Sequence, residues 1–220
     1  MYKIIISLSL FLVLGIDSIR AQNKPYFNEI AAFKEQDKRK APAKNSILFT
    51  GSSSFRMWQD VQTYFPTVPI INRGFGGSTL KDVIYYEKQI IAPYKPRKIV
   101  IYCGENDFAE SDTVEATMVL ERFKTLFAMI RQDLPGVPVI FVSIKPSPSR
   151  QHLMPKMALG NQLIKRFLRK QKKTAFVDVY HKMLNTKGEP RPELFLEDKL
   201  HMNRQGYLIW QKALAPLLAK

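Results

Sequence analysis

Short apolar runs alternate along the chain with longer segments whose apolar residues recur every three or four positions. The short runs are rich in Ile and Val and lack alternation with polar residues, which is typical of strands covered on both faces. The longer segments have the spacing of amphipathic helices. This alternation predicts an α/β fold, a parallel sheet with helices on both sides. The expected strands are residues 47–50, 68–72, 98–103, 137–144 and 175–179.

Several of the helical segments begin with residues that commonly cap helices. Asp112 and Glu115 form a capping-box pattern before the apolar positions of residues 119–134. Either Ser78 or Thr79 is expected to cap the helix that follows them.

Three more segments have helical spacing. Residues 157–173 form one helix, and residues 26–38 form another that is expected at the sheet edge. Near the C-terminal end, Asn203 is expected to cap a helix that Pro216 should kink or close.

The composition suits one folded domain. Of the 220 residues, 45% are hydrophobic, which excludes an intrinsically disordered chain. The single cysteine, Cys103, excludes a disulfide framework and a zinc site built on paired thiolates. We also expect no metal at His152 or His181, because neither has an acidic or thiol neighbour at ligand spacing. No cofactor is expected.

The N-terminal segment has the pattern of a secretory signal. Lys3 precedes an apolar run over residues 4–15, and Ala21 offers a small residue at a cleavage site. The apolar run is shorter than the roughly 20 residues that span a bilayer. We therefore expect residues 1–21 to be removed and residues 22–220 to form one exported domain, periplasmic or secreted.

The chain is strongly basic, with a formal net charge of +15. The densest basic stretch is residues 165–173, which has two interpretations: a solvated helix face, or a face that contacts anionic lipid. On the basis of charge alone, a peripheral contact with anionic surfaces is one expectation. Nucleic acid is not an expected partner, because export would separate the protein from the nucleic acid of the cell.

Polar and glycine-rich residues follow three of the expected strands and recur near the C-terminal end. Ligands of parallel α/β sheets bind beyond the carboxyl ends of the strands, so these clusters mark the place to look for chemistry. The clusters are residues 51–54, 72–78, 104–107 and 198–201.

Each cluster taken alone also has an ordinary structural interpretation. The serines of residues 52–54 are good helix caps, and the glycines of residues 74–77 suit a turn or, weakly, a phosphate loop. Asn106 and the aspartate after it are common in turns. Asp198 and His201 suit a surface ion pair. The occurrence of all four clusters together is what favours catalysis.

The four clusters contain the groups that an acyl-transfer reaction needs. A serine hydroxyl on a strand-to-helix turn is exposed, and a neighbouring imidazole makes it a nucleophile. Asp198 and His201 are three residues apart, so the carboxylate can hold the imidazole while the other ring nitrogen takes a proton. The amide group of Asn106 is a neutral donor for developing negative charge.

The four clusters, in this order, resemble the SGNH (GDSL-type) hydrolase family and its platelet-activating-factor acetylhydrolase-like esterases, over roughly residues 45–215. The resemblance implies a three-layer α/β/α fold with a flavodoxin-like five-stranded parallel sheet. It implies that Ser53 is the nucleophile, with His201 as base and Asp198 as its partner. The oxyanion hole would be formed by the amides of Ser53 and Gly77 and by the Asn106 side chain.

Two positions depart from the eponymous motif. Ser52 replaces the aspartate that usually precedes the nucleophile, and Ser54 replaces a leucine. The first change leaves the hydrogen bonding beside the nucleophile open. With three serines in a row, the alignment of the block favours Ser53 as the nucleophile.

The substrate is constrained less than the chemistry. Phe75 and Phe108 flank the clusters and are expected either to line an acyl pocket or to be core. Lys145 and Arg150 lie on a loop after the fourth strand, which either contacts an acidic sugar or lipid headgroup or is merely solvated. We name Phe75, Phe108 and Arg150 as candidate substrate-binding residues.

The resemblance implies an exported serine esterase that hydrolyses short acyl esters, acetyl above all, on a small ester or an acetylated glycan. The alternatives are a lysophospholipase or phospholipid acetylhydrolase, a non-catalytic glycan-binding module on the same fold, and an acyltransferase.

Overall fold

The computed structural model of the chain describes residues 24–219. The chain divides into two compact units, residues 1–41 and residues 42–220. The predicted signal segment lies outside the described residues. In the first unit the structure describes one helix, α2 (Phe27–Arg39), whose expected place at the sheet edge stays a prediction.

The second unit is built on one five-stranded sheet in which every strand pair is parallel. The strand order is β2-β1-β3-β4-β5, which is the flavodoxin-like order. In this order the chain changes direction across the sheet between β1 and β3, so a crevice opens at the carboxyl ends of these strands. The predicted fold class is therefore confirmed. The strands are β1 (Ile47–Gly51), β2 (Ile70–Gly74), β3 (Lys98–Tyr102), β4 (Val139–Val142) and β5 (Thr174–Val177).

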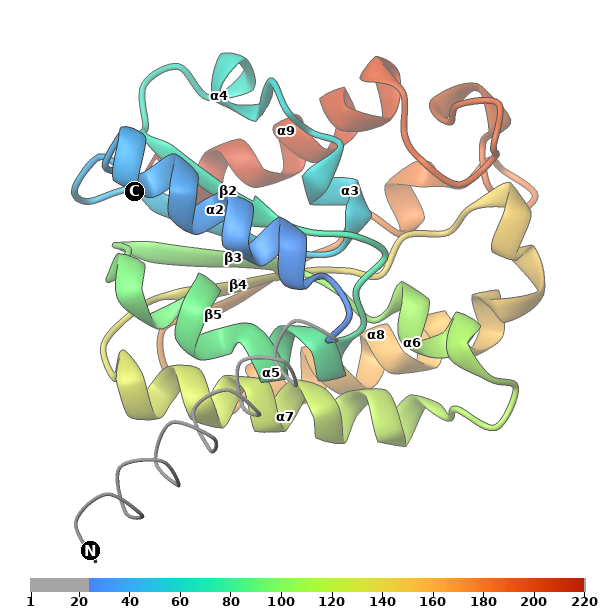
Figure 1. Cartoon of the computed structure of the whole chain (residues 1–220). Coiled ribbons are helices and arrows are strands. Elements are labelled where there is room, and N and C mark those ends of the chain that lie inside the picture. The colour runs from blue at the N-terminus through green and yellow to red at the C-terminus, as the bar shows by residue number, and fades with distance from the viewer. Residues whose placement is uncertain (1–23, 220) are drawn as a thin grey trace, which may run out of the picture. The chain divides into compact units, whose positions relative to one another are not determined.

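Helices cover both faces of this sheet and give three layers (Figure 1). On one face lie α5 (Leu80–Ile90), α7 (Ala116–Asp133) and α8 (Met154–Leu168). On the other face lie α3 (Ser53–Arg56), α4 (Val61–Tyr64) and α9 (Arg204–Leu218). A short helix, α6 (Glu105–Glu110), follows β3, and the 3₁₀ helices are η1 (Ala92–Tyr94), η2 (Pro148–Leu153), η3 (His181–Met183) and η4 (Pro192–Leu194).

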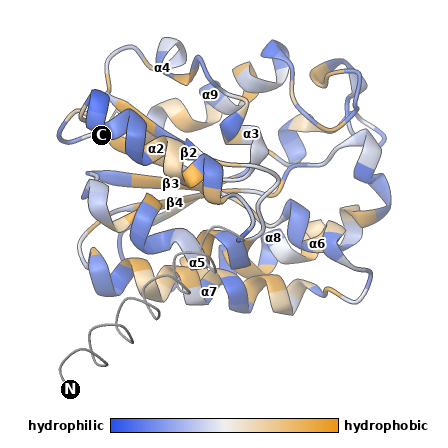
Figure 2. Ribbon diagram, in the orientation of Figure 1, coloured by the Kyte–Doolittle hydropathy of each residue, from blue (hydrophilic) through white to orange (hydrophobic). Residues whose placement is uncertain are grey.

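The core lies on both faces of the sheet. On the α9 side Trp58 stacks on Tyr207 at a ring distance of 4.7 Å and meets Phe49 edge-on at 6.2 Å. On the α7 side Phe123 meets Phe141 at 4.8 Å. Burial of each such ring contributes roughly 1.5–3 kcal/mol. Figure 2 shows the strands mostly in hydrophobic colours and hydrophilic residues on the outer sides of the helices, which explains why the strands lack polar alternation.

The sequence predicted the start of α5 correctly but not the capping of α7. The expected cap at Thr79 is confirmed: the backbone N–H of Thr79 donates to the Asp82 side chain, and the Thr79 hydroxyl accepts from the backbone N–H of Asp82. The capping box at Asp112 and Glu115 is wrong, because Glu115 is the N-cap of α7 but makes no side-chain cap bond. Lys156 binds the Glu115 carboxylate at 2.9 Å and also donates to the Asp112 carbonyl.

Other element boundaries moved by a few residues for identifiable reasons. Strand β2 starts at Ile70, two residues later than expected, because Pro69 has no N–H to donate to the ladder. Helix α8 covers Met154–Leu168 in place of residues 157–173, so half of the basic stretch lies in the turn before β5. This turn includes Lys173 at φ 55°, directly before the first residue of β5.

The last helix has the expected beginning and a different end. The Asn203 side chain accepts hydrogen bonds from the backbone N–H groups of Gln205 and Gly206. The helix does not close at Pro216 but continues to Leu218.

Candidate active site

The expected nucleophile, Ser53, is the first residue of α3, directly after β1. Gly51 makes the turn between them at φ 129°, a conformation that L side chains rarely adopt. A Cβ at Gly51 would lie 1.9 Å from the Tyr102 carbonyl oxygen of β3, so glycine is required there. As the first residue of a helix, Ser53 has an amide N–H without an intrahelical partner. The turn thus presents both the hydroxyl and the amide of Ser53 beyond the sheet.

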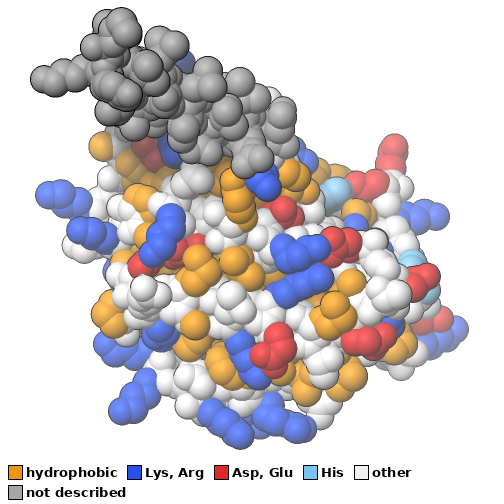
Figure 3. All heavy atoms as spheres, turned by 60° about the horizontal axis from the view of Figure 1, so that its bottom comes forward, with side chains coloured by type: hydrophobic (Ala, Val, Ile, Leu, Met, Phe, Trp, Pro, Cys, Tyr) orange, Lys and Arg blue, Asp and Glu red, His pale blue; other side chains and the backbone are white. Residues whose placement is uncertain are grey.

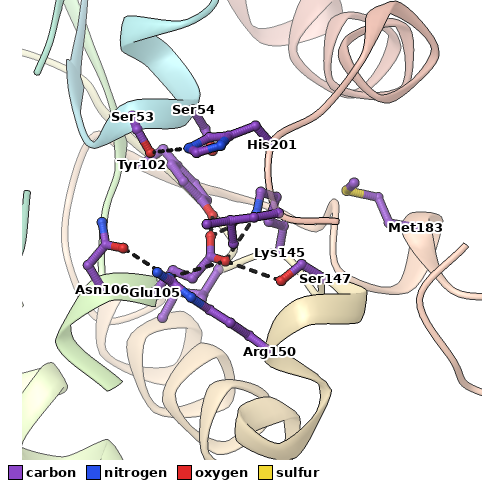
Figure 4. Close-up of polar contacts among 12 residues, drawn as sticks. Ser53, Ser54, Tyr102, Glu105, Asn106, Lys145, Ser147, Arg150, Met183 and His201 are labelled. Carbon is purple, nitrogen blue, oxygen red and sulfur yellow. Dashed lines mark hydrogen bonds and ion pairs between the residues drawn. The ribbon is translucent and has the colours of Figure 1, made fainter. Parts of the chain in front are cut away.

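Folding joins this serine to the Asp198 and His201 pair, and Figure 4 shows the Ser53 hydroxyl facing the His201 ring. His201 Nε2 lies 2.9 Å from Ser53 Oγ, and His201 Nδ1 lies 2.6 Å from Asp198 Oδ2. The two ring nitrogens thus have different partners: Nδ1–H donates to the carboxylate, and Nε2 accepts from the hydroxyl. This is the arrangement in which an imidazole takes the proton of an attacking serine.

Asp198 is held in its charged form by the turn it starts. Its Oδ1 accepts hydrogen bonds from the backbone N–H groups of Leu200 and His201, both at 2.9 Å. Burial works to raise the pKa of Asp198, but these bonds and the one from the His201 ring outweigh it and hold the pKa at about 2. The carboxylate is therefore ionised at any physiological pH and can stabilise an imidazolium.

The expected oxyanion donors come from the strands on either side of β1. Gly77 follows β2 and Asn106 follows β3, and β1 pairs with both strands. A Cβ at Gly77 would lie 3.8 Å from Asn106 Nδ2, so the two residues are neighbours. Asn106 Nδ2 donates to the Ser78 carbonyl at 3.1 Å, which leaves its second N–H for another acceptor. The structure thus brings the Gly77 backbone and the Asn106 amide to the carboxyl end of the strand that carries Ser53.

The neighbours of Ser53 do not compete for the histidine. Ser52 and Ser54 are both buried. The backbone N–H of Ser52 donates to the Tyr102 carbonyl, and the Ser54 carbonyl accepts from the hydroxyl of Tyr207 at 2.8 Å. Both residues hold α3 against the core, and Ser53 is the serine whose hydroxyl binds His201.

A buried charge cluster that the sequence did not predict lies beside the site. Glu105 accepts hydrogen bonds from Lys145 Nζ at 2.9 and 3.1 Å, from Ser147 Oγ at 3.4 Å and from the Tyr102 hydroxyl. Burial raises the pKa of Glu105, but the positive charges of Lys145 and Arg150 outweigh it and lower that pKa. No signal in the sequence pointed to this cluster, because Glu105 stands in the polar block of residues 104–107.

This cluster corrects the expectation for Lys145. The side chain is fully buried against Glu105, so it cannot contact an acidic sugar or a lipid headgroup. Arg150 is partly buried: its Nη1 donates to Asn106 Oδ1 at 2.9 Å and lies 3.4 Å from Glu105 Oε1.

The two phenylalanines proposed as substrate-binding residues are both buried, and the expectation for Phe75 is corrected because that ring belongs to the core. Phe75 is fully buried and meets the Tyr86 ring edge-on at 5.9 Å. Phe108 is buried under α8, where a Cβ on Gly160 would lie 3.1 Å from its ring. Phe75 therefore presents no wall to a substrate, whereas Phe108, although buried, lines a pocket beside Arg150.

A second aspartate–histidine pair lies after β5, and it corrects the expectation that His181 has no acidic neighbour. His181 does have an acidic neighbour: its Nδ1 lies 2.7 Å from Asp178 Oδ2, again three residues apart. Within residues 24–219 no group of three or more His, Cys, Asp and Glu side chains is arranged to hold a metal ion.

A serine, an imidazole and a carboxylate in line, beside amide donors at the switch point of a flavodoxin-like sheet, define a hydrolase that works through a serine nucleophile. A sequence model of the GDSL-like Lipase/Acylhydrolase family matches residues 45–209. The chain belongs to this family and is a serine ester hydrolase.

Known proteins agree with this assignment. The platelet-activating factor acetylhydrolase IB subunit alpha2 of Homo sapiens is 26% identical over 171 residues, covering 73% of this chain and 70% of that protein. A GDSL-like lipase from Bacteroides thetaiotaomicron has the same fold, with a TM-score of 0.73 and 18% identity over 86% of this chain and 97% of that one.

An acetylxylan esterase from Geobacillus stearothermophilus, solved as a catalytic mutant, also shares the fold. Its TM-score is 0.64 at 15% identity, over 80% of this chain and 95% of that one. Catalytic mutants of that esterase at a serine, an aspartate and a histidine have been solved.

Proposed function

We propose that this hydrolase is exported and removes short acyl groups, acetyl above all, from carbohydrate. The observation that carries the proposal is a polar pocket next to the oxyanion side of the site. It has a volume of about 450 Å³ and shares Arg150, the partner of Asn106, with the site. Its lining is Phe108, Ala109, Ser111, Asp112, Ser149, Arg150, His152 and Leu153.

The reaction follows from the distances between the catalytic groups. Ser53 Oγ gives its proton to His201 Nε2 and attacks the ester carbonyl, while Asp198 stabilises the imidazolium. The tetrahedral oxyanion accepts hydrogen bonds from the amides of Ser53 and Gly77 and from Asn106. The alcohol leaves with the proton from His201, and water then attacks the acyl-serine by the same steps.

The pocket favours a sugar over a long acyl chain. The hydroxyl, carboxylate and imidazole groups that line it are partners for sugar hydroxyls, and its one aromatic ring, Phe108, is almost fully buried. The names of the relatives, acetylhydrolase and acetylxylan esterase, both specify an acetyl group.

A phospholipid acetylhydrolase or lysophospholipase is the second candidate. The names of the curated relatives favour it, as does the net charge of +15, which attracts anionic surfaces. Figure 3 shows one face of the molecule, on which Lys and Arg side chains are spread among acidic and hydrophobic ones. None of the helices in residues 24–219 is long and apolar enough to cross a membrane.

A panel of esters separates the two candidates. The enzyme is assayed on p-nitrophenyl esters from acetate to palmitate, on acetylated xylan and on a lysophospholipid. The proposal expects a steep fall beyond butyrate and release of acetate from xylan. A preference for long chains, or hydrolysis of the lysophospholipid alone, would overturn it.

Two controls belong to the same experiment. Labelling by a fluorophosphonate at Ser53, absent from Ser53→Ala, distinguishes the enzyme from a glycan-binding module on the same fold. Faster product formation with an added sugar acceptor than with water alone would indicate an acyltransferase.

Export is proposed from the N-terminal pattern around Lys3 and Ala21. The expected mature chain begins at residue 22. Expression of the full chain in a bacterial host, with fractionation and N-terminal sequencing, tests this. An uncleaved chain in the cytoplasmic fraction contradicts it.

A further inference from the structure

Two hydrogen bonds, one to each end of the Asn106 amide, determine its orientation. Its Nδ2 donates to the Ser78 carbonyl at 3.1 Å, and its Oδ1 accepts from Arg150 Nη1 at 2.9 Å. A flipped amide would place an oxygen against the Ser78 carbonyl and an NH₂ group against the guanidinium. Both contacts would then be lost, because each would join two acceptors or two donors. Ser78 and Arg150 therefore favour the same orientation.

Of the two groups that orient the Asn106 amide, Arg150 is the charged one, and its guanidinium is itself held by a carboxylate. Its Nη1 lies 3.4 Å from Glu105 Oε1, and Lys145 holds the same carboxylate at 2.9 Å. Glu105 and Lys145 are buried, so the Glu105 carboxylate cannot turn outward into solvent. Glu105 directly precedes Asn106 at the start of α6, so anchor and amide share one rigid segment.

The charge of the cluster also suits the reaction. One carboxylate, Glu105, faces two cations, Lys145 and Arg150, so the described group carries one net positive charge. The cation nearest to Asn106 contacts the carbonyl end of the amide. It polarises the amide so that the remaining N–H is a stronger donor toward developing negative charge.

The loop that carries Arg150 also contacts the segment that carries the base. The backbone N–H of Ser149 donates to the Lys199 carbonyl at 3.1 Å, within the turn from Asp198 to His201. Arg150 therefore lies between the donor side and the base side of the site.

We propose that Arg150, anchored on Glu105, is a positioning residue that holds and polarises the Asn106 amide for the oxyanion. The proposal rests on ester hydrolysis, which the family shares, and does not depend on the natural substrate. It revises the expectation that Arg150 binds substrate.

A double-mutant cycle on p-nitrophenyl acetate tests the proposal. Arg150→Met in the parent enzyme should lower kcat about 10- to 50-fold with KM changed less than about threefold, because a transition-state contact is weakened. In the Asn106→Ala background the same change should lower kcat less than about threefold, since the amide it positions is gone.

Arg150→Lys keeps the positive charge without the guanidinium plane and should show an intermediate loss of kcat. It also keeps the test usable if Arg150→Met does not fold, which thermal melting would show.

A matched control is an arginine of α7 that pairs with the helix carrying Glu105 and Asn106. Arg122 pairs with Asp107 of α6 at 2.7 Å, and its side chain is 16% exposed against 18% for Arg150. Arg122→Met removes a similar ion pair without a bond to Asn106, so it should lower the melting temperature and leave kcat within about threefold.

Three results would overturn the proposal. Equal losses of kcat from Arg150→Met in both backgrounds would show that it acts independently of Asn106. A raised KM with unchanged kcat would return Arg150 to substrate binding. Parent-like activity of Asn106→Ala would remove the group that Arg150 is proposed to position.

Discussion

The chain contains two Asp-x-x-His turns with nearly the same internal geometry. In the turn from Asp198 to His201 the ring nitrogen lies 2.6 Å from the carboxylate, and in the turn from Asp178 to His181 it lies 2.7 Å away. In both turns the backbone N–H of the histidine donates to the other oxygen of the same carboxylate, at 2.9 Å in the first turn and 3.2 Å in the second.

The difference between the turns lies in their surroundings. The His201 side chain is 19% exposed and its Nε2 meets Ser53, whereas the His181 side chain is 77% exposed. The turn after β5 therefore has the orienting carboxylate without the nucleophile. The comparison shows that the spacing of a motif predicts a local hydrogen bond, and that the fold decides whether the bond serves catalysis.

Replacing the two histidines should give the largest contrast. His201→Ala removes the base and should lower kcat on p-nitrophenyl acetate by about four to six orders of magnitude. His181→Ala should change kcat less than about twofold, since it removes an exposed ring. Steady-state kinetics of both variants measure this, and a large loss in His181→Ala would contradict the assignment of the base.

The two aspartates should differ almost as much. Asp198→Asn leaves the shape of the turn but no longer holds the imidazole tautomer, so kcat should fall by about three to four orders of magnitude. Asp178→Asn is the matched control with the same change in charge and should stay near the parent. Comparable losses in both variants would indicate an effect of net charge.

Removing an oxyanion donor should lower kcat less than removing the base, because the Ser53–His201–Asp198 hydrogen bonds stay intact. Asn106→Ala removes one donor to the oxyanion and should lower kcat by about two to three orders of magnitude. Fluorophosphonate labelling should be slowed but not abolished. An unchanged kcat would mean that the oxyanion is held by the backbone amides alone.

Acid stability should show the smallest effect. The pKa of Asp198 is about 2 in the folded chain against an ordinary 3.8, so folding favours the charged form. Its contribution is present above about pH 4 and is lost as the pH falls toward 2.

The side chain is 46% exposed, so the stabilisation is screened and should be less than about 1 kcal/mol. Urea unfolding of the parent and Asp198→Asn at pH 5 and pH 2 measures it, with Asp178→Asn as control. A difference that grows toward pH 2 would contradict the sign.

The sequence was sufficient to predict the sheet, because buried strands are local patterns. Ser53, His201 and Asp198 were predicted from the resemblance of the four blocks to a known family, and the structure brings the three side chains together. Buried strands need continuous apolar runs, and parallel strands end at one edge, so the residues after β1, β2 and β3 had to meet. The start of β2 shifted at Pro69, where one residue decides which backbone groups can join the ladder.

The parts that sequence did not predict depend on contacts between distant segments. Glu105 and Lys145 are 40 residues apart, and each alone has the pattern of a surface charge. Phe75 and Phe108 stand beside catalytic residues, but their direction relative to the core is set by α5 and α8. Side-chain direction at a strand end cannot be read from spacing alone.

The bond between Ser53 and His201 joins residues that are 148 positions apart, and this distance has a consequence for synthesis. The ribosome makes the nucleophile and the donors of β1 to β3 long before it makes the base. A nascent chain therefore cannot attack esters until the segment leading into α9 has emerged and folded back. Hydrolytic competence arrives late during translation, after the sheet that supports it.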